Sequence, residues 1–122
     1  MRPRHPPAIG RAALRGRQVT IRQPDCRTAL AMAEAEKTDG GYRRAVGMNA
    51  VLVAGCLWRW GRPLFPDAGA AMAALTPDEL ADLALQCQAA IERAAMPPEA
   101  RNPAFSEADY RRMGRMKRGQ DG

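Results

Sequence analysis

The hydrophobic pattern of the chain is built around one long apolar stretch. No charged side chain occurs from Ala45 to Trp58, AVGMNAVLVAGCLW, and arginines stand on both sides of it. As a helix, this stretch would carry apolar or small groups on every face, so it must be largely buried. We therefore expect the core helix here, with a buried strand at residues 51–58 as the alternative. A bilayer span would need about 20 mostly apolar residues, more than this stretch provides.

A second apolar stripe begins after a strong helix-start signal. Thr76-Pro77-Asp78-Glu79 combines a threonine N-cap, a proline at the first helical position and a glutamate placed for a capping box. The apolar residues that follow recur at helical spacing, and they are Leu80, Leu83, Ala84, Cys87, Ile91 and Ala94. We expect a helix that ends before Met96 and packs on the first one, with Val46, Val53, Leu57, Leu80, Leu83 and Ile91 in one core.

The residues before the core helix predict a strand and a shorter helix. Residues 1–10 are rich in proline and arginine and predict a disordered arm, in which His5 has no expected role. Residues 17–22, RQVTIR, alternate β-branched and polar side chains, which predicts a strand that could turn back on residues 12–14 as a hairpin. Asp25 then caps a helix whose buried face would carry Cys26, Ala29, Leu30 and Ala33.

The stretch after the core helix, Gly61-Arg-Pro-Leu-Phe-Pro-Asp67, predicts a turn. Its glycine and two prolines stop a helix. Leu64 and Phe65 are apolar residues within this turn, and we expect them to fold back onto the core. Asp67 can cap a short alanine-rich segment from Ala68 to Leu75.

These elements predict a fold that is mainly α, a small helical domain with a short N-terminal β-strand or hairpin and flexible basic termini. We divide the chain into a basic arm or hairpin start at 1–16, a helical domain at 17–96 and a basic tail at 97–122. Ser106 and Asp109 give that tail a weaker capping signal for a short helix at 107–117.

The charge of the chain favours an acidic partner. Its 122 residues carry a formal net charge of +6, which suits contact with nucleic acid or with an acidic protein surface. The nucleic-acid alternative uses the tail residues Arg111, Arg112, Arg115, Lys117 and Arg118. No groove-reading module accompanies them, so we expect any such binding to be weak, non-specific and sensitive to salt.

Catalytic chemistry is not visible in the sequence. There is one histidine, no nucleophile motif, no phosphate-binding glycine loop and no cluster of metal ligands, so we expect neither an enzyme nor a cofactor. The three cysteines, Cys26, Cys56 and Cys87, are widely spaced within apolar patterns, which predicts buried free thiols. With no secretory signal in view, the expected location is the cytoplasm.

The order of these elements resembles bacteriophage tail assembly chaperones. The residues that carry the resemblance are VTIRQPD before a helix, the apolar helix, the turn GRPLFPD, and a TPDEL helix that ends in AIER. The resemblance therefore covers Arg17 to Arg93. The resemblance implies a non-enzymatic protein of a long-tailed phage or prophage. Such a protein binds the tape measure protein in the host cytoplasm, keeps it soluble during tail tube assembly, and can also meet the tail tube protein.

A chaperone of this kind needs exposed apolar side chains. Four candidates cluster in sequence at the end of the core helix, and two more form a seam in the tail; the expected partner-binding residues are Trp58, Trp60, Leu64, Phe65, Tyr110 and Met113. A helix of the partner in a shallow groove is the recognition mode that fits them. Self-association through the N-terminal strand edge is a further expectation. The alternatives are a small protein-interaction module of a phage or bacterium and a nucleic-acid-binding accessory protein.

Overall fold

The computed structural model describes residues 5–96. The chain divides into two compact units, residues 1–91 and 92–122, and of the second only the end of one helix is described. The predictions made for the C-terminal tail therefore lie outside the described residues. No helix in the described part of the chain is long and apolar enough to cross a membrane.

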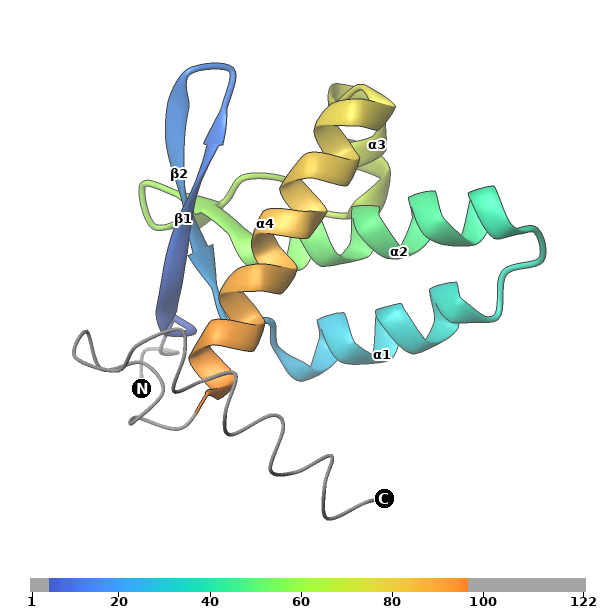
Figure 1. The fold of residues 1–122 in the computed structure, drawn as a ribbon, viewed down its shortest axis with the longest axis horizontal. Helices are drawn as coiled ribbons and strands as arrows, with labels where there is room; N and C mark the ends of the chain where they lie inside the picture. Colours follow the sequence, from blue (N-terminus) through green and yellow to red (C-terminus); the bar gives the residue numbers. More distant parts are fainter. Residues whose placement is uncertain (1–4, 97–122) are drawn as a thin grey trace, which may run out of the picture. The chain divides into compact units, whose positions relative to one another are not determined.

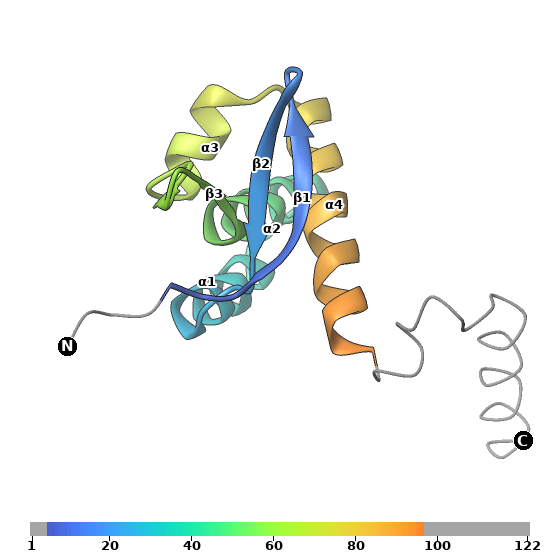
Figure 2. The ribbon, with the colours of Figure 1, turned by 90° about the vertical axis from the view of Figure 1, so that its left-hand side faces the viewer.

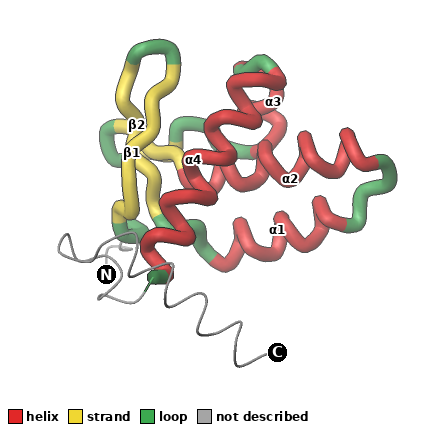
Figure 3. Tube along the Cα trace, viewed as in Figure 1, coloured by secondary structure: helices red, strands yellow, loops and turns green. Residues whose placement is uncertain are grey.

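The first unit contains a four-stranded antiparallel sheet in the order β1-β2-β3-β4. Figures 1 and 3 label its first two strands. Strands β1 (Ala8–Leu14) and β2 (Arg17–Arg22) form the long hairpin. β3 (Leu57–Arg59) pairs with the end of β2 through Thr20 and Ile21, and β4 (Arg62–Pro63) returns along β3. The predicted hairpin is confirmed, and the second hairpin extends it into a sheet.

The helices lie on one face of this sheet, as Figure 2 shows with the strands toward the viewer. The four helices of the described residues are α1 (Cys26–Glu36), α2 (Gly41–Cys56), α3 (Ala68–Ala74) and α4 (Pro77–Ala95). The inner face of the sheet carries Ala12, Val19, Ile21 and Leu57, all buried. The strand period of two therefore places their polar neighbours on the outer face.

The expectation of a mainly α fold is wrong, because the protein is mixed α and β. The core helix ends at Cys56, and Leu57 is already extended at φ −87° and ψ 128°. Leu57 to Arg59 find backbone partners in β2, and the GRPLFPD stretch supplies the fourth strand. A continuous apolar run has no periodicity that marks where a helix gives way to a strand. Long-range pairing decides where one ends and the other begins.

The expectation of a disordered arm up to Gly10 is wrong for its last residues. Ala8 pairs with Arg22 and Gly10 with Ile21, with a bulge between them. Gly10 lies against α4, where an added Cβ would be 3.2 Å from that of Ala90. The absence of a side chain at Gly10 lets the strand approach the helix.

One core contains apolar residues of both α2 and α4, as predicted. Val53, Leu57, Leu80 and Leu83 are buried as expected, while Val46 and Ile91 are partly buried against them. Cys56 and Cys87 are also buried, but Cys26 is exposed, so the expectation of three buried thiols is wrong for that residue. Ala71, Leu75 and Phe65 close the core beside α3.

The three predicted caps are confirmed. Asp25 accepts a hydrogen bond from the Thr28 amide at the start of α1, and Asp67 accepts one from the Ala70 amide at the start of α3. At α4, the Glu79 amide donates to the Thr76 hydroxyl. The Thr76 amide donates in turn to the Glu79 carboxylate, which completes the capping box.

Helix α1 contributes no buried residue, so the predicted buried face of this helix is wrong. Leu30, expected inside, is 69% exposed. The helix packs on α2 through small residues instead: a Cβ at Gly55 would lie 2.9 Å from the Cβ of Thr28 and closer still to its other side-chain atoms. The glycine of the core helix is therefore required by the close approach of α1.

Candidate partner-binding site

The turn between β3 and β4 holds a tryptophan in an unfavourable backbone conformation. Trp60 has φ 53° and Gly61 has φ 75°, so both central residues of this two-residue turn are left-handed. Such turns favour asparagine or aspartate before glycine. A bulky residue there is uncommon and costs free energy. The side chain of Trp60 gains no burial in return, because it is 85% exposed.

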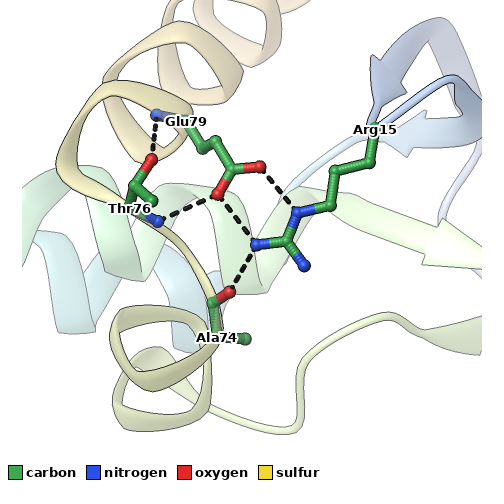
Figure 4. Close-up of polar contacts among 4 residues, drawn as sticks. All are labelled: Arg15, Ala74, Thr76 and Glu79. Carbon is green, nitrogen blue, oxygen red and sulfur yellow. Dashed lines mark hydrogen bonds and ion pairs between the residues drawn. The ribbon is translucent and has the colours of Figure 1, made fainter.

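In the β1–β2 hairpin, the side chain at the same turn position makes contacts with the helices. Arg15 has φ 50° before Gly16 at φ 77°. Its guanidinium donates to both carboxylate oxygens of Glu79, at 2.7 and 2.8 Å, and to the Ala74 carbonyl at 2.9 Å (Figure 4). Arg15 therefore connects the turn to the helices. Among the described residues, Trp60 has no comparable contact with another element.

Among residues 5–96, the Trp60 ring stacks with its neighbour in the same hairpin. The guanidinium of Arg59 lies 4.1 Å from the centre of the ring. A cation over an exposed aromatic face contributes about 0.5 to 1 kcal/mol. This contact leaves the indole 85% exposed, so the ring is accessible to a partner.

A hollow of about 400 Å³ lies beside this hairpin. Its apolar wall includes Trp58, Phe65 and Val51, and the N-capping aspartates Asp25 and Asp67 also line it. Hydrogen bonding from the Thr28 amide holds the pKa of Asp25 below its usual range. Arg27 lines the hollow too, and its guanidinium lies 3.8 Å from the Asp25 carboxylate, so this charge is partly balanced. The hollow thus combines an aromatic wall with a few charged groups of both signs, a lining suited to apolar side chains of a partner.

Trp58 lies on the outer face of the sheet and is partly covered. The guanidinium of Arg22 is 5.2 Å from the centre of its ring, and the His5 ring packs on it with centroids 5.0 Å apart. Arg22 also donates a hydrogen bond to the Pro6 carbonyl at 2.7 Å. His5, for which the sequence suggested no role, therefore helps to cover Trp58.

The structure separates the four candidates from the GRPLFPD region. Trp58 and Phe65 line the first hollow, while Leu64 lines a second one at the inner side of the hairpin tips. Trp60 stands alone at the tip, and Phe65 is buried in the core as expected. Tyr110 and Met113 lie outside the described residues, as do the nucleic-acid candidates Arg111, Arg112, Arg115, Lys117 and Arg118.

Sequence reasoning missed several exposed apolar residues on the helices. Leu30, Tyr42, Met72 and Leu85 are each at least 45% exposed. Leu85 follows the buried Leu83 and Ala84 in α4, so helical spacing could have placed it outside. Arg59 was also missed as the neighbour that stacks on Trp60, since stacking depends on the turn geometry.

The two buried thiols are hydrogen-bonded to each other, and this contact lowers the pKa of Cys56. A hydrogen bond with Cys56, together with burial, raises the pKa of the Cys87 thiol. A buried thiol with a raised pKa stays protonated and inert. Within residues 5–96, no three His, Cys, Asp or Glu side chains gather where they could hold a metal ion.

Comparison of the chain with protein family models, with curated proteins and with solved structures gave no match. The functional argument therefore rests on the residues and geometry described above.

Proposed function

We propose that this protein is a non-enzymatic binding protein whose anchor is Trp60, and that its partner is the tape measure protein of a long-tailed phage or prophage. In this proposal it acts as a tail assembly chaperone in the host cytoplasm, with the tail tube protein as a second candidate partner. The single observation that carries the binding role is an 85% exposed tryptophan held in a left-handed turn. The specific partner comes from the family resemblance.

The energetics of Trp60 support a binding role. A fold under selection for stability alone would place asparagine at this position. Residues held in rarely populated backbone conformations cluster at functional sites, where the surrounding structure compensates for them. Tryptophan is also the residue type most enriched among those that dominate binding energy at interfaces. Exposure and backbone strain therefore suggest the same role.

The surroundings of Trp60 support a helical partner. An amphipathic helix docks through apolar side chains at intervals of three or four residues, each of which needs a shallow recess or an aromatic surface. Trp60 offers the surface, and the hollow beside Trp58 and Phe65 offers the recess. A tape measure protein, with its long apolar helices, would present such side chains.

Co-expression tests this proposal. The chain is co-expressed with a tape measure protein, the partner that the proposal names, and the soluble fraction of that partner is measured with and without the chain. A recovered complex and a higher soluble fraction are expected. If the tape measure protein is equally insoluble in both cases and no complex is recovered, the chaperone assignment fails. A complex with a different protein through Trp60 would then favour the general interaction module.

A further inference from the structure

The strands of this protein carry positive charge without any negative charge. Residues 8–22 and 57–63 contain six arginines and neither aspartate nor glutamate; the arginines are Arg11, Arg15, Arg17, Arg22, Arg59 and Arg62. Only Arg15 among them forms an ion pair with another described residue. The acidic residues of the described part lie on the helices, at their caps and in the connection between α1 and α2. The sheet is therefore the electropositive layer of the first unit.

Two of these arginines oppose each other directly. Arg59 of β3 pairs with Arg62 of β4 across the second hairpin. Side chains at directly opposite positions have Cβ atoms about 4.5 to 5.5 Å apart, and like charges there are destabilising. In the described structure no carboxylate compensates this pair. The hairpin therefore concentrates positive charge at a local cost to the fold.

A second hollow of about 370 Å³ lies where this charge is greatest. Its lining consists of three arginines and three aliphatic residues, which are Arg15, Arg17, Arg59, Leu14, Val19 and Leu64. Glu79 already neutralises Arg15. Arg17 and Arg59 form no ion pair with a described residue, although the Arg59 guanidinium also lies over the Trp60 ring. Two positive charges are therefore left without a carboxylate beside an aliphatic wall. The ligand that matches this lining is anionic and aliphatic at once.

We infer that this hollow receives an acidic segment of a polypeptide partner, with a glutamate or aspartate between Arg17 and Arg59 and a neighbouring aliphatic side chain on Leu14, Val19 and Leu64. The aliphatic wall favours a polypeptide over nucleic acid. Single-stranded nucleic acid is held by bases stacked on aromatic side chains, and this hollow has none. The inference rests on the proposed function only because both need a protein partner.

A labelled peptide of alternating leucine and glutamate serves as the probe, and fluorescence anisotropy measures its Kd. The same peptide with glutamine for glutamate tests the charge, and an oligothymidine tests nucleic acid. We expect the glutamate peptide to bind at least about tenfold more tightly than the glutamine peptide, because hydrogen bonds to charged groups are the stronger ones. Binding should weaken as salt rises.

Two variants with equal charge change locate the site. Arg17→Gln/Arg59→Gln removes these two guanidinium groups, and Lys37→Gln/Arg43→Gln removes two positive charges near the α1–α2 connection. The first should weaken binding of the glutamate peptide about tenfold or more, while the second should change it less than about twofold. Circular dichroism melts check that both variants fold. Methyl NMR shifts of Leu14, Val19 and Leu64 in the unchanged protein should move on titration.

Several outcomes would overturn the inference. The first two are that the glutamate peptide does not bind and that the glutamine peptide binds with the same Kd. The next two are that both double variants lose the same affinity for the glutamate peptide and that the methyl signals that move on titration all lie away from Leu14, Val19 and Leu64. The last is that the oligothymidine binds more tightly than the peptide and depends on the same two arginines. In any of these cases the proposed function would still be supported if a complex with the tape measure protein is recovered with the wild-type chain and is not recovered with Trp60→Ala. The two ideas therefore fail separately.

Discussion

Arg15 and Glu79, 64 residues apart in the chain, form a two-point ion pair that links the turn of the first hairpin to the start of α4. The same carboxylate accepts a hydrogen bond from the Thr76 amide, so one side chain caps the helix and holds the hairpin (Figure 4). Arg15 also reaches the Ala74 carbonyl at the end of α3. Besides the shared apolar core, one glutamate thus gives the first hairpin and α4 a polar connection.

This arrangement predicts a dependence of stability on pH. Two hydrogen bonds lower the pKa of Glu79 from 4.5 to about 2. The one from Arg15 has the larger effect, and the one from the Thr76 amide has the next largest. Because the folded-state pKa is depressed, the stabilisation is fully present above the unfolded-state value and is lost as pH falls toward the folded-state value. We expect the urea concentration at the unfolding midpoint of wild type to decrease as the pH is lowered from about 5 to about 2.

Glu79→Gln should lower the midpoint at about pH 6 and flatten its fall in acid, because the variant has no carboxylate to protonate. Glu36→Gln is the matched control, since Glu36 is exposed and makes no side-chain hydrogen bond or ion pair with described residues. A Glu79→Gln curve that runs parallel to wild type across this range would show that the ion pair does not link stability to pH.

A glycine substitution tests the close packing of α1 on α2. Gly55→Ala should destabilise the fold by about 1 to 3 kcal/mol, the usual cost of overpacking, because the new Cβ would meet the Thr28 side chain. Gly47→Ala, on the same helix, would place a Cβ 3.9 Å from that of Ala35, an ordinary contact. It should raise stability by up to about 1 kcal/mol, the helix propensity difference. Equal effects in chemical denaturation would refute this packing.

A pair of leucines in α4 tests the burial pattern of that helix. Leu83 is 1% exposed and Leu85 is 69% exposed. Leu83→Ala should cost about 2 to 5 kcal/mol, whereas Leu85→Ala should change stability by less than about 0.5 kcal/mol. Thermal or urea denaturation measures both. Similar losses for the two variants would mean that α4 does not face the core as described.

Local signals in the sequence predicted the helix starts well. The capping box at Thr76 and Glu79 and the caps at Asp25 and Asp67 depend on residues within one turn, and all three are present. The buried stripe of α4 was also predictable, because an amphipathic period survives without knowledge of the rest of the fold. The first hairpin followed from the β-branched alternation of residues 17–22.

Features that depend on distant partners were not predictable. The second hairpin forms because Leu57 and Trp58 pair with Ile21 and Thr20, contacts that no local pattern encodes. Arg15 could not be matched to Glu79 for the same reason. For the site, Trp60 was named from the cluster of apolar residues at the end of the core helix, but its left-handed backbone depends on the hairpin that sequence reasoning missed.

The central claim is that Trp60 serves a partner and not the fold, and Trp60→Asn tests it most directly. Asparagine tolerates the left-handed turn better than tryptophan does, while the exposed contact with Arg59 is worth about 0.5 to 1 kcal/mol. Stability should therefore stay within about 1 kcal/mol of wild type. If the proposed function is right, the affinity for the tape measure protein should fall by at least about 2 kcal/mol, roughly thirtyfold in Kd.

Leu85→Asn is the control, because Leu85 is exposed on α4 and away from the hairpin turns. The decisive measurement is the Kd of the tape measure complex for wild type, Trp60→Asn and Leu85→Asn, with a thermal melt of each protein. A normal melt with a thirtyfold weaker complex for Trp60→Asn alone is the predicted result. A lowered melting temperature with an unchanged Kd would contradict the account, since Trp60 would then serve the fold.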